Sequence, residues 1–178
     1  MNLKYRIKLL SDWHCGSGLD SGSEADLLVI KDENGMPYIP GKTIKGLLRD
    51  ACLEMIQVGK MDLEKMNQIF GQASEKKKKP GTARFTNATL REEEYEELVQ
   101  NGLAPLLYRN IASTAIDEKG VTREYSLRTM EVAIPLELEG EIEGVKETEI
   151  IEKAMKWVRH LGSGRNRGLG RCQWEICA

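Results

Sequence analysis

A glycine- and arginine-rich stretch near the C-terminus holds the residues best suited to bind an anion. HLGSGRNRGLGR, residues 160–171, places Arg165, Arg167 and Arg171 among four glycines. Guanidinium groups form forked hydrogen bonds to phosphates, and glycines let a backbone approach a ligand closely. Because the stretch leaves a predicted helix and enters a predicted strand, it is neither a dinucleotide-binding motif nor a P-loop. It predicts a clamp on a phosphate backbone; the alternative is a helix cap at Gly162 followed by a flexible turn.

A second basic segment, PYIPGKTIKGLLRDA, covers residues 37–51 and opens a predicted helix. Lys42, Lys45 and Arg49 fall on one face of that helix, opposite its apolar stripe. Taken alone, this face is equally typical of a solvated surface, but the two basic segments together favour an anionic ligand. Gly46 inside the helix costs about 1 kcal/mol relative to alanine, which either a close approach to its backbone or tight packing explains.

The charge of the chain is segregated along the sequence. The 178 residues carry a formal net charge of −2, which argues weakly against a nucleic-acid partner, and the segments 91–97 and 137–149 are acidic. In contrast, the stretch 159–171 contains four arginines and no acidic residue. A local basic face of this kind can bind a polyanion while the acidic faces keep the protein in solution.

Composition argues against several classes of protein. The cysteines form no CxxC pair and only two histidines accompany them, so we expect no structural zinc site and free, mostly buried thiols at Cys15, Cys52, Cys172 and Cys177. No apolar run approaches the roughly 20 residues that span a bilayer, and the N-terminal segment is too short and too alternating for a signal peptide. We therefore expect one cytoplasmic domain over residues 1–178, without membrane contact.

The periodicity of the apolar residues predicts a mixed α+β fold. The expected strands are 3–10, 27–32, 83–90, 126–138 and 171–177, and the expected helices are 39–55, 62–69, 91–100 and 148–162. The lysine-rich segment 74–81 is expected to be a solvated loop. The principal elements run strand, helix, strand, strand, helix, strand, which is the order of a ferredoxin-like (RRM-like) βαββαβ core with inserted loops.

On this element order, the pairing of IPGKTIKGLLR with GSGRNRGLGR resembles the RAMP superfamily of CRISPR-associated proteins. More narrowly, the chain is similar to the repeated backbone subunit of type III CRISPR effector complexes. HCGSG resembles the first glycine loop of the family, ADLLVIKDENGMPYIPG the segment that enters its first helix, and IFGQAS with GTARFTNATL its Phe-Gly pair and following strand. IASTAIDEKGVTREYSLRTMEVAIPLEL resembles its thumb hairpin and returning strand.

The resemblance, which covers nearly the whole chain, implies a protein that holds RNA within a larger assembly. Copies of the chain would stack as a filament along a CRISPR guide RNA, beside other type III effector subunits, and base pairing would select the complementary target RNA. A thumb hairpin at about residues 110–128 would displace one base pair. By the same resemblance, the guide phosphates would contact two sets of residues: Lys42, Thr43, Lys45 and Arg49, and Gly164, Arg165, Arg167 and Gly168.

The resemblance also implies that a loop aspartate cuts the target RNA, and the matching position is Asp26 in EADLLVIKD. A carboxylate is a suitable ligand for Mg²⁺ or Mn²⁺, and the metal would help to orient a ribose 2′-hydroxyl for in-line attack on its own phosphodiester. Asp20 and Glu24 are neighbours that could share the metal or take over the role. The alternative is that Asp26 only begins a strand, as a turn or cap residue.

Histidines and tryptophans supply further candidates. His14 is a candidate for RNA contact or base catalysis, although a structural role is commoner at this position of the family. His160 is expected at the C-terminus of a helix, where the dipole favours it. The three tryptophans are expected in the core or at its rim, at positions Trp13, Trp157 and Trp174.

Four functions remain open on the sequence alone. The first is an RNA-guided, RNA-cleaving backbone subunit of a type III complex, and the second is a structural subunit of the same assembly that holds guide RNA without cutting. The third is a repeat-RNA processing endoribonuclease of the same superfamily. The fourth is an unrelated ferredoxin-like module that binds a small anion.

Overall fold

Strand β1 (Leu3–Leu9) lies inside a four-stranded antiparallel sheet, in a computed structural model that describes residues 2–16, 27–73, 78–114 and 127–177. Its alternating apolar residues are buried and its lysines are exposed, because successive side chains of a strand point to opposite faces of the sheet. The strand order is β4–β7–β1–β8, with every neighbouring pair antiparallel. The other strands are β4 (Arg84–Phe85), β7 (Glu137–Glu143) and β8 (Cys172–Cys177).

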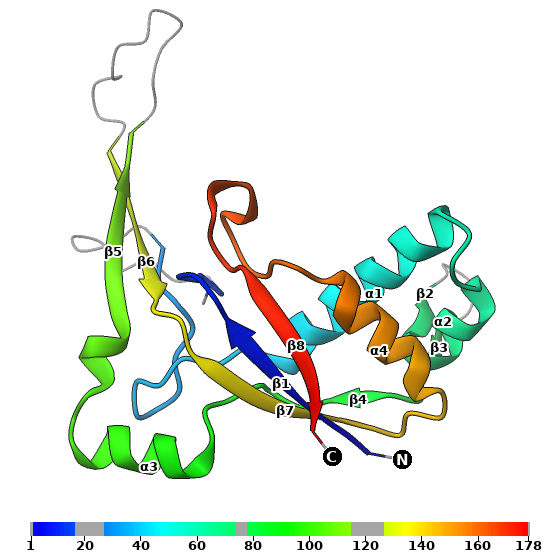
Figure 1. The fold of residues 1–178 in the computed structure, drawn as a ribbon, viewed down its shortest axis with the longest axis horizontal. Helices are drawn as coiled ribbons and strands as arrows, with labels where there is room; N and C mark the ends of the chain where they lie inside the picture. Colours follow the sequence, from blue (N-terminus) through cyan, green and yellow to red (C-terminus); the bar gives the residue numbers. More distant parts are fainter. Residues whose placement is uncertain (1, 17–26, 74–77, 115–126, 178) are drawn as a thin grey trace, which may run out of the picture.

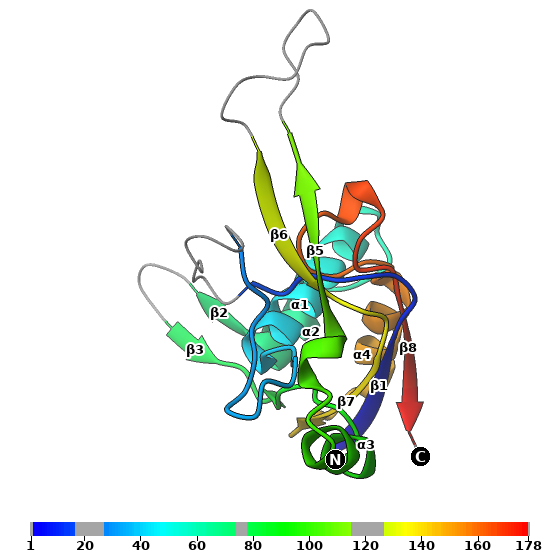
Figure 2. The same ribbon diagram turned by 90° about the vertical axis from the view of Figure 1, so that its left-hand side faces the viewer.

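Two helices cover one face of this sheet (Figures 1 and 2). Helices α1 (Gly41–Gln57) and α4 (Thr148–Trp157) pack against each other, and their buried residues join the apolar face of the sheet in one core. Along the chain this unit runs β1, α1, β4, β7, α4, β8. The order is that of the predicted βαββαβ core, and the α+β fold class is confirmed. None of the described helices combines the length and the apolar character needed to cross a membrane.

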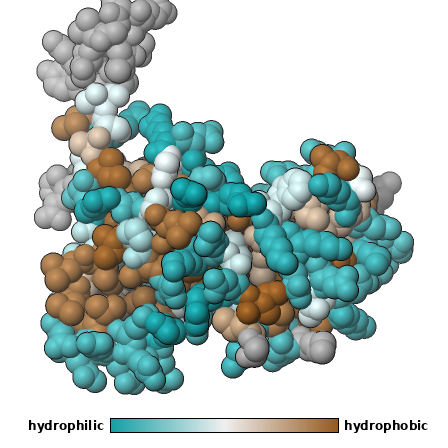
Figure 3. Space-filling view, viewed as in Figure 1, coloured by the Kyte–Doolittle hydropathy of each residue, from teal (hydrophilic) through white to brown (hydrophobic). Residues whose placement is uncertain are grey.

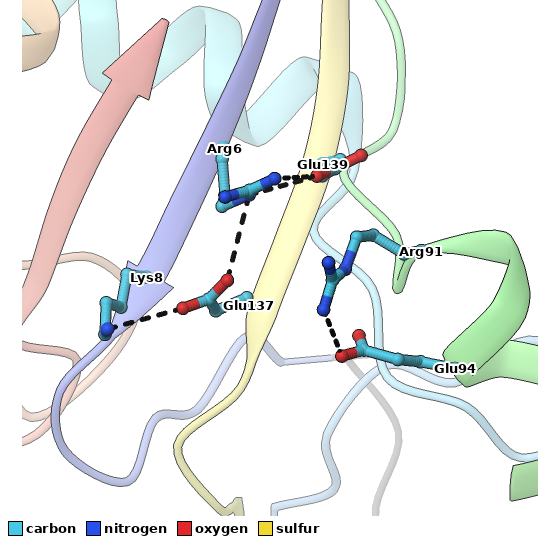
Figure 4. Close-up of polar contacts among 6 residues, drawn as sticks. All are labelled: Arg6, Lys8, Arg91, Glu94, Glu137 and Glu139. Atoms are coloured by element: carbon cyan, nitrogen blue, oxygen red, sulfur yellow. Dashed lines mark hydrogen bonds and ion pairs between the residues drawn. The ribbon is translucent and has the colours of Figure 1, made fainter. Parts of the chain in front are cut away.

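The opposite face of the sheet carries rows of opposite charge (Figure 4). Arg6 Nη2 lies 2.8 Å from Glu139 Oε1, and Lys8 Nζ lies 3.4 Å from Glu137 Oε1. The hydrogen bond to Glu139 raises the pKa of the Arg6 guanidinium. Exposed ion pairs contribute less than about 1 kcal/mol each to stability. Their larger effect is electrostatic, because a row of glutamates along β7 makes this face unfavourable for a polyanion.

A long hairpin stands away from the sheet (Figures 1 and 2). Its strands, β5 (Tyr108–Ser113) and β6 (Arg128–Ala133), pair from Tyr108 opposite Ala133 to Ser113 opposite Arg128. These strands flank the segment in which the sequence predicts a thumb. Residues 115–126, between the two strands, lie outside the described residues.

Shorter elements complete the fold, and one of them corrects a prediction. Helices α2 (Leu63–Phe70) and α3 (Glu92–Gln100) lie where helices were predicted. Strands β2 (Gly71–Ala73) and β3 (Lys78–Pro80) form a small antiparallel pair, so the prediction of a solvated loop over 74–81 was wrong for its C-terminal part. Lysines are poor indicators of a strand, and this one is only three residues long. There are also two short 3-10 helices, η1 (Ala104–Leu107) before β5 and η2 (Arg165–Arg167) between α4 and β8.

The predicted strand over 126–138 is in fact two strands in two different sheets. β6 belongs to the hairpin and β7 to the main sheet, and Ile134–Leu136 connects them. Pro135 lies in this connection, where it removes one backbone donor and disfavours a continuous strand. The apolar alternation continues on both sides of the proline, so the pattern alone did not reveal the break.

The helix predicted over 148–162 ends earlier, at Trp157. Val158 has an extended backbone, with φ −74° and ψ 110°, and the chain from Arg159 to Leu161 bonds to the segment Gly170–Cys172 instead. His160 is therefore not a helical residue; it forms a bridge with Arg171. Val158 and Leu161 are buried as predicted, but outside the helix. Because these two residues continue the helical spacing of apolar positions, the sequence pattern predicted a helix that is too long.

Two further predicted strands are shorter than expected. Of the segment 83–90, only Arg84–Phe85 forms a strand, and isolated bridges join Thr89 to Glu139 of β7 and Ala88 to Ile39. The segment 27–32 forms no strand and contributes only isolated bridges. One of these pairs Leu27 with Met130 of β6, which places the segment along the base of the hairpin.

Candidate nucleic-acid interface

The glycine–arginine loop is a folded structure held in place by its own glycines. Gly162 and Gly170 have positive φ angles of 77° and 68°. A Cβ atom added at Gly162 would lie 2.2 Å from the His14 carbonyl oxygen, and one added at Gly170 would lie 1.8 Å from the Leu161 carbonyl oxygen. Only glycine fits such positions. Since α4 already ends at Trp157, Gly162 does not cap that helix, and the alternative interpretation of a cap followed by a flexible turn fails.

The loop rests on the segment that follows β1. Gly170 N donates a hydrogen bond of 2.7 Å to the Asp12 carbonyl oxygen, and Ser163 N donates one of 2.9 Å to that of His14. The same segment bonds to the hairpin on its other side. Trp13 N donates to the Ala133 carbonyl oxygen at 3.0 Å. Residues 12–14 therefore fix the loop and the base of the hairpin relative to each other.

Asp12 strengthens this connection with a buried charge. Its side chain is 7% exposed and accepts hydrogen bonds from the Arg109 guanidinium on β5, whose own side chain is 64% exposed. The sequence did not predict this contact, because 97 positions separate the two residues and neither lies in a motif. Burial of an aspartate requires such a counter-ion.

His14 is buried among these contacts. It is 2% exposed, and its Nδ1 lies 2.7 Å from the Glu131 carbonyl oxygen. Since a carbonyl only accepts, Nδ1 carries a proton in this contact. Burial and this hydrogen bond favour a structural role for His14 over base catalysis.

A groove of about 980 Å³ opens between the loop, the hairpin and α1. Figure 1 shows the loop, in red, beside the hairpin. The hairpin contributes Ile111, Ser113 and Met130 to the lining, and the loop contributes Gly164, Arg165 and Arg167. Both arginines are exposed, and neither pairs with a carboxylate in the part of the chain that the structure describes. Gly168 follows directly and is also exposed.

Helix α1 lines this groove with residues other than its predicted RNA-binding residues. Its lining residues are Leu47, Asp50, Ala51 and Glu54. The predicted cationic residues Lys42, Lys45 and Arg49 do not line the groove. The N-terminal turn of α1 instead reaches the segment after β1, where Thr43 hydrogen-bonds the Cys15 thiol. Burial raises the pKa of that thiol, while the Thr43 bond and the charge of Lys42 lower it.

The two basic segments therefore approach each other through residues 12–16 without forming a single lining. His14 bonds the loop, and Cys15 contacts the start of α1. RNA contact by the predicted residues of both segments stays a prediction.

Gly46 is a half-buried residue inside α1. A Cβ atom at this position would meet no atom within 4 Å. Tight packing, one of the two explanations for a glycine inside this helix, is therefore excluded among the described residues. The other explanation, a ligand that approaches the helix backbone, remains.

The loop that contains Asp20, Glu24 and Asp26 lies outside the described residues, but the chain that follows it is firmly held. Glu131 N donates to the Leu27 carbonyl oxygen at 2.9 Å. The Glu131 carboxylate accepts hydrogen bonds from Val29 N at 3.0 Å and Lys31 Nζ at 2.7 Å. Asp26 thus precedes a residue fixed against β6, the strand whose Met130 lines the groove.

Among the described residues, no three histidine, cysteine, aspartate or glutamate side chains gather closely enough to hold a metal ion. Asp26 with Asp20 or Glu24 has the oxygen ligands that Mg²⁺ prefers.

Comparisons with known proteins place this fold in a family. A model of the RAMP superfamily matches residues 6–173, and the chain belongs to that superfamily. The structure is similar to a chain of Type III-B Cmr-beta bound to cognate target RNA, solved by cryo-EM, with a TM-score of 0.76 and 12% identity over 99% of this chain and 97% of that chain. A chain of Type III-B Cmr-beta in the apo state gives a TM-score of 0.74 and 13% identity over the same shares. No curated protein matches the sequence significantly.

We predict that Arg109→Ala destabilises the protein more than Asp12→Ala. The first change leaves a buried carboxylate without its partner, at a cost of about 1–3 kcal/mol, whereas the second removes the buried charge and leaves an arginine in water. Urea unfolding of both variants measures the difference. A larger loss for Asp12→Ala would contradict the role of Arg109 as its counter-ion.

Replacement by alanine should change the stability of the protein in opposite directions at two glycines that have open space beside them. Gly46→Ala should stabilise the protein by about 1 kcal/mol, because it relieves the cost of glycine in a helix. Gly168→Ala should destabilise it by about 1–2 kcal/mol, because the φ of Gly168 is 82°. Urea unfolding of the RNA-free protein tests both. A loss of stability in Gly46→Ala would restore the packing explanation.

Proposed function

We propose that this chain is the guide-RNA-binding backbone subunit of a type III CRISPR effector complex. The observation that supports it best is the groove between the glycine–arginine loop and the hairpin, which presents two exposed, unpaired arginines among described residues of a RAMP protein. Arginines without carboxylate partners are available for phosphates. In this proposal Arg165 and Arg167 bind phosphates of the RNA backbone, a contact that positions the strand without reading its sequence.

Partners of the subunit follow from the same proposal. Several copies would stack along one guide RNA together with other effector subunits, and a complementary target RNA would pair with the guide. Figure 3 shows an apolar area at the lower left, over η1. Leu10 and Leu106, exposed by 38% and 70%, are among the apolar residues at the surface. Exposed apolar patches mark protein contacts, which supports assembly with a neighbouring subunit.

Cleavage of the target RNA by Asp26, with Mg²⁺ or Mn²⁺, is the second part of the proposal. Leu27 pairs with Met130 of β6, a residue that lines the groove, and Asp26 directly precedes Leu27 in the sequence. The cation, when bound, supplies Lewis-acid stabilisation of the scissile phosphate. The side chains of this chain would hold the RNA backbone in line for attack by the 2′-hydroxyl.

Removal of the loop arginines should flatten the salt dependence of RNA binding. We expect the double variant Arg165→Ala with Arg167→Ala to bind single-stranded RNA more weakly. The slope of the logarithm of the binding constant against the logarithm of the salt concentration should become less steep by about 0.7 per lost phosphate contact. Filter binding over a salt series measures both. Lys4→Ala with Arg84→Ala, two cations of the charged sheet face, is the matched control. If the loop variant and the control variant lost the same affinity, the proposal that RNA binds in the groove would be contradicted. An affinity that does not depend on salt would favour a module that binds a small anion.

Asp26→Ala should abolish target cleavage while guide binding survives. In the assembled complex with Mg²⁺, we expect the cleavage rate to fall by more than about a hundredfold, with Asp20→Ala and Glu24→Ala as parallel variants. Gel analysis of labelled target RNA measures the products. Unchanged cutting in Asp26→Ala would assign another residue. Guide binding without any cutting by the wild type would favour the structural subunit, and metal-free cutting of precursor RNA by the chain alone would favour a processing nuclease.

A further inference from the structure

A second hollow, of about 390 Å³, lies on the helical side of the molecule. Its lining combines an apolar floor with a ring of cations. Met55 of α1 and Trp157 of α4 form the floor, and Lys60, Lys153 and Lys156 stand around it. No carboxylate in the described part of the chain lines this hollow. Neither segment that the sequence singled out as basic contributes to it.

The hollow continues the groove rather than standing apart from it. Trp157 lines both spaces, together with Arg159 on the groove side. The indole Nε1 donates a 2.7 Å hydrogen bond to Glu54 Oε2, which orients the ring. A strand of nucleic acid that follows the groove from Arg165 past Arg159 therefore meets Trp157 before it reaches the three lysines.

The three lysines are free to bind an anion. All are exposed, and none pairs with a carboxylate among the described residues. Lys65, slightly further along, differs because it pairs with Glu147 at 3.2 Å. A neighbouring hollow is lined by Lys65 and shares Lys60 and Lys153 with the hollow beside Trp157, but it also contains Asp62, Glu147 and Glu149. The hollow beside Trp157 is thus lined by three lysines and by no carboxylate among the described residues.

The ring of Trp157 already attracts a cation. Lys60 Nζ lies 5.4 Å from the ring centroid, and this contact shows that one ring face is accessible from the hollow. Aromatic faces that bind cations also stack on bases. Because Lys60 is long and exposed, a base could displace its ammonium group, which would then remain close to the adjacent phosphate.

We propose that this hollow is a nucleotide subsite, in which one base of single-stranded RNA stacks on Trp157 while Lys60, Lys153 and Lys156 bind the neighbouring phosphates. The inference deepens the proposed RNA-binding function and rests on it. An apolar aromatic floor with cations at its rim is the combination by which proteins hold single strands without reading their sequence. The subsite extends the RNA path beyond the groove, across α4.

The test compares a short single-stranded RNA, long enough to fill the groove only, with one twice its length. We expect the triple variant Lys60→Gln, Lys153→Gln and Lys156→Gln to bind the long RNA about tenfold more weakly and to bind the short RNA with unchanged affinity. Trp157→Leu should give a similar loss on the long RNA, and Trp157→Phe should retain most of the affinity. The matched control removes three cations from the sheet face, as Lys4→Gln, Lys8→Gln and Arg84→Gln.

Each outcome decides between the two proposals. If the wild type binds both RNAs and the lysine variant keeps the same affinity for the long RNA as the sheet-face control, the proposed subsite is wrong and the proposed RNA binding in the groove is unaffected. If the wild type binds neither RNA, both proposals fail. If inorganic polyphosphate competes for the hollow as well as RNA does, and Trp157→Leu has no effect, the hollow is an anion site without base stacking and the proposal is overturned. Retained folding of every variant is checked by urea unfolding.

Discussion

Three consecutive residues, Asp12 to His14, hold the two walls of the groove together. The Asp12 and His14 carbonyl groups accept hydrogen bonds from the glycine–arginine loop. The Asp12 carboxylate, the Trp13 backbone and the His14 ring bond to the hairpin. Buried backbone groups must be paired, so neither wall can move away without leaving unsatisfied groups behind. The width of the groove is thus set by a short stretch that lines none of it.

An acidic protein with this fold can still bind a polyanion, because its charges occupy separate surfaces. The glutamates of β7 face solvent on the open side of the sheet, where β1 partly neutralises them. The loop arginines face the groove without described partners. Within the groove, Asp50 and Glu54 lie on α1. Their repulsion would keep phosphates away from these two residues of α1 and near the loop arginines.

The sequence predicted those parts of the structure that depend on local patterns. Alternation identified β1, the apolar stripes identified α1 and α4, and the mixture of glycine and arginine located the loop. Predictions failed where distant contacts decide the outcome. Leu161 bonds to Gly170 and so ends α4 early, and Arg109 meets Asp12 from the hairpin. Lys42, Lys45 and Arg49 do not line the groove beside the loop, because the packing of the core determines which face of α1 turns toward it.

Glycines in this chain serve two purposes, and only one of them bears on function. In the loop, positive φ angles and the close approach of the His14 and Leu161 carbonyl groups require Gly162 and Gly170. The fold would need them with or without a ligand, so the motif is weaker functional evidence than its sequence suggests. Gly46 differs, because no described atom crowds it and a helix is less stable with it. RNA binding is therefore supported by features that the fold does not require: an uncrowded glycine on α1, and Arg165 and Arg167, which pair with no carboxylate among the described residues.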